Sequence, residues 1–278
     1  MVRKLKEIID ISKEFVTEEL SFEEIKWLLK DIFSLQDYEL ITKKNDYFDD
    51  EKYFALLKKA NDIPVAYLLG YQTFFEYKFK VNKNVLIPRN ETEELVLMCL
   101  NYIEKAKYNS LNIIEIGSGS GCISISLKKE LDKKNIESKI TSGDIALEAI
   151  EISKLNAKNL NAEVEFVVSD CLDNILNEDC DIIISNPPYI TKDEFVSERV
   201  LNNEPKIALF SSDNGIEVYE KIFRECHRFK SLKALFFEIS PSIENDLKII
   251  QKQYLPLFEI VFIKDINGFV RFATIIKK

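Results

Sequence analysis

The chain has 278 residues, 46% of them hydrophobic and 31% charged, a composition typical of a folded protein with one large domain or two ordinary ones, which excludes a disordered or fibrous chain. No apolar run reaches the roughly 18 residues that a membrane span requires, and the start, MVRKLKEIIDISKEF, has no signal-peptide core, so we expect a cytoplasmic protein without a membrane partner. A net charge of −9, with residues 1–70 themselves acidic, disfavours binding to nucleic acid, which needs a face rich in lysine and arginine.

Residues 1–70 are predicted to form a separate domain of short amphipathic helices. Apolar residues recur at helical spacing, for example at Phe22, Ile25 and Leu28. Ser21 and, three residues later, Glu24 form a capping box, which predicts that a helix begins between them. No proline-rich linker follows this domain in the sequence, so its boundary near residue 70 is predicted only from the change to an extended, β-rich pattern.

Residues 71–87 are rich in aromatic and β-branched side chains and are predicted to form a β-hairpin that connects two domains. Pro88 ends this stretch, and Asn90 is predicted to cap a helix that runs through Leu95. Arg89 could meet a carboxylate of the substrate or cofactor, but we expect a structural ion pair with Glu91 or Glu94 instead.

Residues 88–278 are predicted to be an α/β domain, because apolar strands alternate with amphipathic helices from residue 112 onward. Such alternation is typical of a mostly parallel sheet covered on both faces. The predicted strands are NIIEI, KITSGD, EVEFVV, DIIIS, ALFFEI, FEIVFIK and FVRFATII. The predicted helices between them are ISISLKKEL, IALEAIEISKLNAK, GIEVYEKIFRECHRF and PSIENDLKIIQKQY.

Three of the seven glycines, Gly117, Gly119 and Gly121, fall within five positions directly after the first of these strands. Glycine at such a turn lets the backbone approach a ligand closely, and the next helix offers free N–H groups. A dinucleotide fingerprint would need glycine where Cys122 stands, whereas E-x-G-x-G-x-G, starting at Glu115, fits methyltransferases that use S-adenosylmethionine. The pattern therefore favours that cofactor.

Acidic residues at the ends of the next two strands support this interpretation. Asp144 is placed to accept both ribose hydroxyls, and Asp170, with Cys171 beside it, is placed near an adenine ring. An isolated acid at a strand end is more often a solvated turn or helix cap. The prediction of a cofactor site therefore rests on the whole series, in which the glycine turn, Asp144 and Asp170 follow three successive strands.

Asn186-Pro187-Pro188-Tyr189, directly after the strand DIIIS, is the most specific motif in the chain. A planar amide or aromatic amine has a delocalised nitrogen lone pair and attacks a methyl sulfonium poorly. The Asn186 side-chain oxygen and the Pro187 carbonyl are predicted to hold both N–H groups, and Tyr189 to stack on the flat group. No general base is then obligatory.

The segments LIPRNETEELV, EIGSGSGCISISL, the strand end at Asp144, ISNPPYI, NNEPKIALFSSDNGIEVYEKI and DINGFVRF together resemble the PrmC/HemK family of protein-(glutamine-N5) methyltransferases. The resemblance covers almost the full length. It implies a class I, Rossmann-like methyltransferase fold with a seven-stranded, mostly parallel sheet, a small N-terminal helical domain that recognises the substrate, and a hairpin connector. It implies methylation of the glutamine in the Gly-Gly-Gln motif of class 1 peptide-chain release factors, with S-adenosyl-L-homocysteine as the product.

Pattern and resemblance together assign the site residues. The residues expected to bind the cofactor are Glu115, Gly117, Ser118, Gly119, Ser120, Gly121, Asp144, Asp170, Cys171 and Asn186. The residues expected to hold the glutamine are Asn186, Pro187, Pro188 and Tyr189, and Asn186, Pro187 and Tyr189 are the expected catalytic set. With one histidine and five scattered cysteines, no metal site of these residues is expected.

Three alternatives stay open at the level of sequence. An adenine-amino methyltransferase of DNA or RNA faces the same lone-pair problem and flips its base out of the helix. A methyltransferase acting on a ribosomal-protein glutamine would share every catalytic residue. A catalytically silent protein that keeps the fold as an interaction platform is the non-enzyme alternative.

Overall fold

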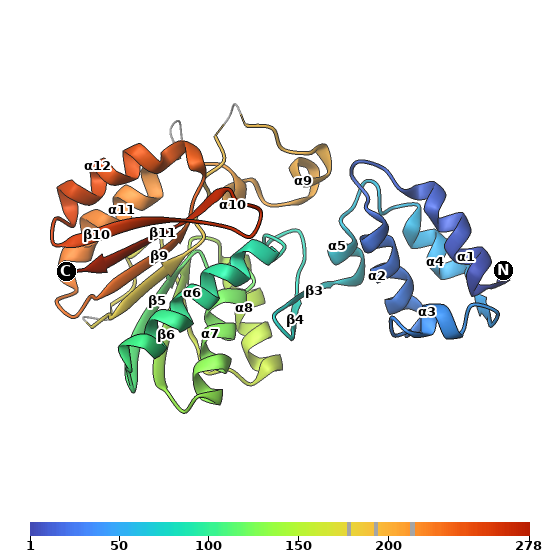
Figure 1. Ribbon diagram of the computed structural model, residues 1–278, viewed down its shortest axis with the longest axis horizontal. Coiled ribbons are helices and arrows are strands. Elements are labelled where there is room, and N and C mark those ends of the chain that lie inside the picture. The colour runs from blue at the N-terminus through green and yellow to red at the C-terminus, as the bar shows by residue number, and fades with distance from the viewer. Residues whose placement is uncertain (177–178, 192–193, 212–214) are drawn as a thin grey trace. The chain divides into compact units, whose positions relative to one another are not determined.

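The computed structural model describes residues 1–176, 179–191, 194–211 and 215–278 (Figure 1). The chain forms two compact units. The smaller unit consists of Met1–Tyr71 and Phe195–Asn203, and the larger of Gln72–Glu194 and Glu204–Lys278. The smaller unit is therefore discontinuous in sequence, since its second segment comes from within the predicted domain 88–278. None of the helices in the described ranges is long and apolar enough to cross a membrane.

The smaller unit is mostly helical, and its elements are β1 (Val2–Lys4), α1 (Leu5–Ser12), η1 (Lys13–Phe15), α2 (Phe22–Phe33), α3 (Glu39–Thr42), β2 (Tyr47–Asp49), α4 (Glu51–Leu57), α5 (Val65–Leu69) and α9 (Glu198–Asn203). The capping box at α2 is confirmed, because Ser21 Oγ accepts from the Glu24 N–H while the Glu24 carboxylate accepts from the Ser21 N–H. The sequence did not predict the antiparallel pair β1–β2, whose three-residue strands are too short to show a periodic pattern.

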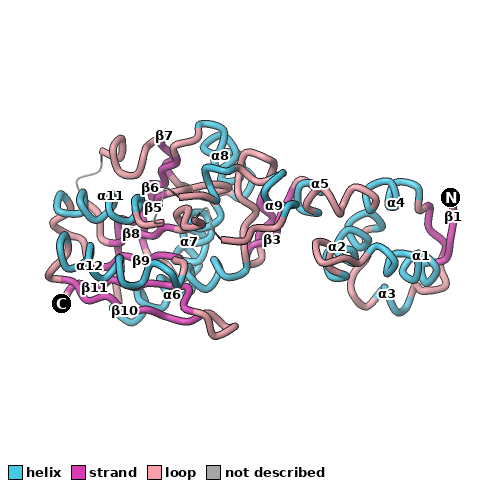
Figure 2. The backbone as a smooth tube through the Cα atoms, turned by 90° about the horizontal axis from the view of Figure 1, so that it is seen from above, coloured by secondary structure: helices cyan, strands magenta, loops and turns pink. Residues whose placement is uncertain are grey.

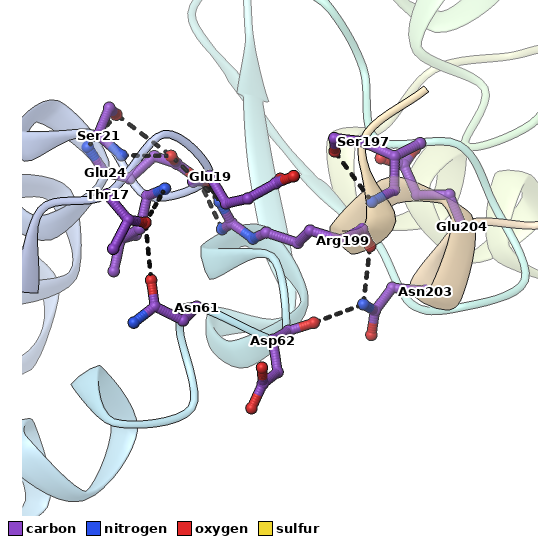
Figure 3. Close-up of polar contacts among 12 residues, drawn as sticks. Thr17, Glu19, Ser21, Glu24, Asn61, Asp62, Ser197, Arg199, Asn203 and Glu204 are labelled. Carbon is purple, nitrogen blue, oxygen red and sulfur yellow. Dashed lines mark hydrogen bonds and ion pairs between the residues drawn. The ribbon is translucent and has the colours of Figure 1, made fainter. Parts of the chain in front are cut away.

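Helix α9 is fixed to the smaller unit by polar contacts (Figure 3). The guanidinium of Arg199, which is 7% exposed, donates to both carboxylate oxygens of Glu24, at 2.7 and 3.3 Å, and also to the carbonyl of Glu19. Asn203 donates to the carbonyl of Asp62 at 2.6 Å. The acid that closes the capping box of α2 is therefore also the partner of a residue far away in sequence.

The larger unit begins with a two-stranded hairpin and continues as a seven-stranded sheet with helices on both faces. Its elements are β3 (Tyr71–Phe74, whose first residue belongs to the smaller unit), β4 (Tyr77–Lys80), α6 (Asn90–Ala106), β5 (Ser110–Ile116), α7 (Cys122–Lys133), β6 (Glu137–Asp144), α8 (Leu147–Leu160), β7 (Glu165–Val168), β8 (Ile182–Ser185), α10 (Lys206–Leu209), α11 (Glu217–Glu225), η2 (Cys226–Arg228), β9 (Ala234–Glu238), η3 (Pro241–Ile243), α12 (Glu244–Tyr254), β10 (Phe258–Lys264) and β11 (Val270–Lys277).

The strand order of the sheet is β10-β11-β9-β8-β5-β6-β7. The pairs from β9 to β7 are parallel, whereas β11 is antiparallel to both of its neighbours. The predicted α/β class with a mostly parallel, seven-stranded sheet is confirmed. The strand order reverses at β5, because β6 and β7 follow it on one side whereas β8 lies on its other side. Open α/β sheets bind their ligands at such a reversal point.

Two apolar cores cover the two faces of the sheet. Alternate residues of a strand point to opposite faces, so in β8 Ile182 and Ile184 join one core and Ile183 joins the other. The first core contains the apolar sides of α6, α7 and α8, and the second contains those of α11 and α12 (Figures 1 and 2). The central strands are buried on both sides, which explains their continuous apolar sequences.

The predicted strands and helices of this unit agree with the structure to within a few residues, but the short helix α10 was not predicted and the predicted cap of α6 was wrong. Asn90 is the first residue of the helix and not its cap, and the cap position, Arg89, makes no side-chain capping bond. Glu93, in the first turn, instead accepts the Phe75 N–H of the hairpin. Residues 212–214 of the segment NNEPKIALFSSDNGIEVYEKI lie outside the described residues.

Candidate active site

A cavity of about 380 Å³ opens at the carboxyl ends of β5, β6 and β8. These strands are neighbours in the sheet, in the order β8-β5-β6. The turn after each strand contributes to the wall, because the carboxyl ends of parallel strands meet at one edge. All of the predicted site residues except Gly121 and Tyr189 line this cavity.

The backbone of the turn after β5 is bonded to the neighbouring strand β6. The N–H groups of Gly117 and Ser118 both donate to the carbonyl of Gly143 at the end of β6, at 2.8 and 3.0 Å. The Gly119 N–H donates to Asp144 Oδ2 at 2.8 Å. The turn is therefore fixed to the neighbouring strand before any ligand is considered.

The three glycines of this turn all have positive φ angles, of 81°, 50° and 80° at Gly117, Gly119 and Gly121. A Cβ atom at Gly119 would meet nothing within 4 Å, and one at Gly117 would come no nearer than 3.8 Å to any atom. A Cβ atom at Gly121 would lie 2.8 Å from Ile125 Cδ1 and 3.2 Å from Ser153 Cβ. Gly117 and Gly119 thus border open space, whereas Gly121 allows close packing of the turn against α7 and α8.

Ser118 and Ser120, the residues between these glycines, are buried in the same turn. Ser118 Oγ lies 3.1 Å from Ser153 Oγ of α8. Ser120 Oγ is buried and has no hydrogen-bond partner among the described residues. Its hydroxyl thus retains unused hydrogen-bonding capacity next to the cavity.

Glu115, the last acid before the turn, is completely buried. Ser142 donates to its Oε2 at 2.5 Å, while Oε1 has no hydrogen-bond partner within the described chain. Burial away from water raises the pKa of this carboxyl to about 7. An acid in this setting is poised to meet a positive group or a donor in the cavity.

Asp144 accepts a hydrogen bond from the glycine turn and also lines the cavity. Its two carboxylate oxygens accept the N–H groups of Gly119 and Ala146, at 2.8 and 2.9 Å. Burial raises the pKa of Asp144, and these backbone bonds oppose the shift. Because a carboxylate has about four lone-pair directions, each oxygen keeps capacity for another donor.

Asp170 and Cys171, which follow β7, also line the cavity. The Asp170 carboxylate is exposed and pairs with Lys221 at 2.9 Å. Cys171 is buried, and burial together with the nearby Asp170 raises the pKa of its thiol to about 12. The thiol is therefore protonated at neutral pH and contributes a neutral, polarizable wall.

The Asn186 amide is held by a side chain that was not among the predicted site residues. Its Nδ2 donates to Thr92 Oγ1 in the first turn of α6, at 3.1 Å. The amide oxygen Oδ1 is therefore turned away from Thr92. Pro187 and Pro188 follow on the cavity wall.

Tyr189 is placed differently from these three residues. Its hydroxyl donates to Glu238 Oε1 at 3.0 Å, and burial strongly raises its pKa. The predicted stacking of Tyr189 on a substrate stays a prediction, because its ring is not part of the cavity wall.

Thr92 and Glu238 are the residues near the motif that sequence reasoning missed. Thr92 lies in the segment LIPRNETEELV and Glu238 ends β9, so both were within recognised segments, but neither has a local pattern that signals a role. Arg89 pairs with the buried Glu204, whose carboxylate also accepts the Ile87 N–H at 3.1 Å. The prediction that Arg89 forms an ion pair is confirmed, and the predicted partners were wrong.

Comparisons with known proteins agree with this geometry. The family model described as the methyltransferase small domain matches residues 93–207. The chain is 38% identical over 228 residues to the release factor glutamine methyltransferase of Bacillus cereus, covering 79% of each chain. It is 32% identical over 270 residues to the release factor glutamine methyltransferase of Staphylococcus aureus, covering 93% of this chain and 94% of the relative.

Among solved structures, a methyltransferase from Pyrococcus furiosus matches with a TM-score of 0.50 at 17% identity, over 83% of this chain and 99% of the other. The hMettl16 catalytic domain in complex with MAT2A 3'UTR hairpin 6 matches with a TM-score of 0.56 at 17% identity, over 73% and 76% of the two chains. At this level of identity the likeness concerns the fold alone.

Proposed function

The chain belongs to the release factor glutamine methyltransferase family, and from that membership we propose that it transfers the methyl group of S-adenosylmethionine to the side-chain amide nitrogen of the glutamine in the Gly-Gly-Gln motif of class 1 peptide-chain release factors. The product of the cofactor is then S-adenosyl-L-homocysteine. The observation that carries the proposal is the Asn186 amide on the cavity wall, with its nitrogen engaged by Thr92 and its oxygen turned away from that contact.

The residues of the cavity fit the proposed cofactor. Open space beside Gly117 and Gly119 leaves room for a ligand against the backbone of the turn. Asp144 keeps acceptor capacity for a pair of ribose hydroxyls, and Glu115 Oε1, which has no hydrogen-bond partner among the described residues, keeps acceptor capacity toward a donor in the cavity. When bound, S-adenosylmethionine supplies an electrophilic methyl group on a sulfonium centre. Asp170 and Cys171 are proposed to flank the adenine.

The Asn-Pro-Pro-Tyr motif is proposed to orient the glutamine amide. Asn186 Oδ1 and the Pro187 carbonyl accept its two N–H groups, which fixes the plane of the amide and directs the face of the nitrogen toward the methyl donor. Two adjacent prolines keep these acceptors rigid and add no competing N–H donor at positions 187 and 188. Holding the amide supplies the geometry for attack, so no general base has to remove a proton before it. The nitrogen becomes cationic and acidic as the N–CH3 bond forms and the S–CH3 bond breaks, and one N–H proton then passes to water.

Parallel substrates test the proposal. Labelled S-adenosylmethionine is offered with a release factor, with the Gln-to-Ala variant of its Gly-Gly-Gln motif, with a ribosomal protein fraction and with unmethylated DNA, and the product is mapped by mass. We expect label on the release factor that disappears in the Gln-to-Ala variant. Label on DNA or on a ribosomal protein would replace the proposed substrate, and no label on any of them would support the silent alternative.

The smaller unit is proposed to select the release factor, because a cavity of about 380 Å³ accommodates a ligand and one side chain but little of a folded protein. Tyr38 and Ile41, near α3, are 66% and 74% exposed and are suitable probes. The double variant Tyr38→Glu, Ile41→Glu is compared with wild type on a folded release factor and on a short Gly-Gly-Gln peptide. We expect kcat/KM to fall on the folded substrate only, and equal effects on both substrates would contradict the selective role.

A further inference from the structure

The Asn186 amide belongs to a chain of hydrogen bonds that runs along the cavity wall to Thr92 and ends at Glu238, which is not part of that wall. Asn186 Nδ2 donates to Thr92 Oγ1 at 3.1 Å, and Thr92 Oγ1 in turn donates to Glu238 Oε2 at 2.8 Å. Thr92 and Glu238 are 3% and 2% exposed, so water has little access to either. The three residues come from the end of β8, the first turn of α6 and the end of β9.

The number of protons in this chain fixes its direction. A threonine hydroxyl has one proton to donate, and a carboxylate can only accept. Because Thr92 gives its proton to Glu238, its oxygen must act as the acceptor toward Asn186. The atom of Asn186 that faces Thr92 is then the amino group, and the amide oxygen is the atom left for a substrate.

Glu238 is itself held in place and contacts the motif a second time. Its Oε1 accepts the Tyr189 hydroxyl at 3.0 Å, and its backbone carbonyl accepts the Tyr219 hydroxyl at 2.7 Å. Burial raises the pKa of Glu238, whereas the hydrogen bonds from Thr92 and Tyr189 and the charge of Arg271 oppose that shift. One carboxylate thus contacts Tyr189 directly and Asn186 through Thr92.

We propose that Thr92 and Glu238 are positioning residues for methyl transfer: Glu238 orients the Thr92 hydroxyl, and Thr92 holds the Asn186 amide with its oxygen available to the glutamine. The inference rests on the proposed function. If the Asn186 amide were rotated by 180°, its NH2 group would face the N–H groups of the glutamine. The acceptor Oδ1 would then point toward Thr92 and would not be available to the substrate. Neither residue touches the substrate in this scheme, so both act through Asn186.

Thr92→Val tests the first step, because valine keeps the shape of threonine and removes the hydroxyl. Thr92→Ser is the matched control that restores the hydroxyl. We expect Thr92→Val to lower kcat about tenfold to a hundredfold, the range that follows from losing one buried hydrogen bond, while Thr92→Ser stays within about threefold of wild type. The dissociation constant for S-adenosyl-L-homocysteine and the melting temperature are measured for both variants, since an effect confined to amide orientation leaves them nearly unchanged.

Glu238→Gln tests the second step without removing side-chain volume. The glutamine amino group must donate either to Thr92 or to Tyr189, and when it donates to Thr92 that hydroxyl is free to donate to Asn186, which favours the turned amide. We expect kcat to fall about tenfold. A Glu238→Gln enzyme with wild-type kcat would contradict the role of the carboxylate.

Hydrogen exchange of the Asn186 side-chain amide, followed by NMR without substrate, separates this inference from the proposed function. We expect slow exchange in wild type and in Thr92→Ser, and faster exchange in Thr92→Val. Wild-type turnover in Thr92→Val, an equal loss of kcat in the Val and Ser variants, or a loss of kcat that parallels a loss of cofactor-product affinity or stability would overturn the positioning role. A wild-type enzyme that leaves the release factor unmethylated while its Asn186 exchange is slow would refute the proposed function and leave the hydrogen-bond chain intact.

Discussion

The turns after β5 and β8 lie side by side at one edge of the sheet, yet they are held by different means. The backbone of the glycine turn is bonded to the Gly143 carbonyl and the Asp144 carboxylate, about 25 residues away, and its Gly119 and Ser120 carbonyls accept from the side chains of Ser153 and Asn156 in α8. The Asn-Pro-Pro-Tyr turn is held by side chains of Thr92 and Glu238, which are 94 and 49 residues from Asn186 and Tyr189. In the first turn it is the backbone that makes these bonds, and glycine at its key positions is a signal visible in the sequence, whereas in the second turn the bonds join side chains of residues far apart in the chain.

The largest expected effect comes from removing the central side chain of the second turn. Asn186→Ala deletes one of two proposed acceptors, and losses of about a hundredfold to a thousandfold are typical when one preorganised hydrogen-bonding group is removed from an active site. We expect kcat to fall by that factor while the melting temperature stays close to that of wild type, because the substitution removes an acceptor at the cavity and leaves the glycine turn in place. Asn101→Ala, at an exposed position of α6, is the matched control. Near-normal turnover of Asn186→Ala would remove the basis of the proposed mechanism.

Glu115 tests whether a buried side chain also matters beside the glycine turn, because it is completely buried directly before that turn. Its pKa is about 7 in the folded protein against 4.5 without burial, so the folded state binds the proton more tightly. The free energy of unfolding therefore falls as pH rises from 4.5 to 7, by about 3 kcal/mol from this group.

Glu115→Gln removes that contribution. Urea unfolding at several pH values between 4.5 and 8 is expected to show wild type losing stability relative to Glu115→Gln across this window. The difference between the two proteins isolates Glu115 from other titrating groups. Parallel stability curves would show that the carboxyl does not keep its proton in the folded state.

Two smaller effects distinguish Gly121, which allows close packing, from Gly119, which borders the cavity. Gly121→Ala combines a left-handed backbone with an added Cβ 2.8 Å from Ile125, and about 2 to 3 kcal/mol of stability is expected to be lost. Gly119→Ala has the backbone cost of about 1 kcal/mol without a clash, but its methyl group enters the cavity. We therefore expect Gly121→Ala to lower the melting temperature more, and Gly119→Ala to weaken S-adenosyl-L-homocysteine binding more. The reverse order would mean that the roles of the two glycines are exchanged.

The same contrast explains how far the sequence could be interpreted without a structure. The strands, the glycine turn and the positions of Asp144 and Asn186 follow from local periodicity and from residues adjacent in the chain. The role of Thr92 could not be predicted, because its partners come from β8 and β9 and meet it only after the sheet and α6 have assembled. A three-residue strand such as β1 gives no pattern either, since its partner β2 lies more than forty residues away.

The pairing of Arg199 with Glu24 is another such distant contact, at a separation of 175 residues. It has a consequence for the order of events during synthesis. Roughly 130 residues separate Tyr71 from Asn203, and the ribosome adds them in about 7 to 26 s at roughly 5–20 residues per second. During that interval the first helices have been made but lack α9, and the Glu24 carboxylate has only its capping partner, Ser21. Residues 1–71 are therefore synthesised first, but the compact unit to which they belong is complete only after α9 has been synthesised.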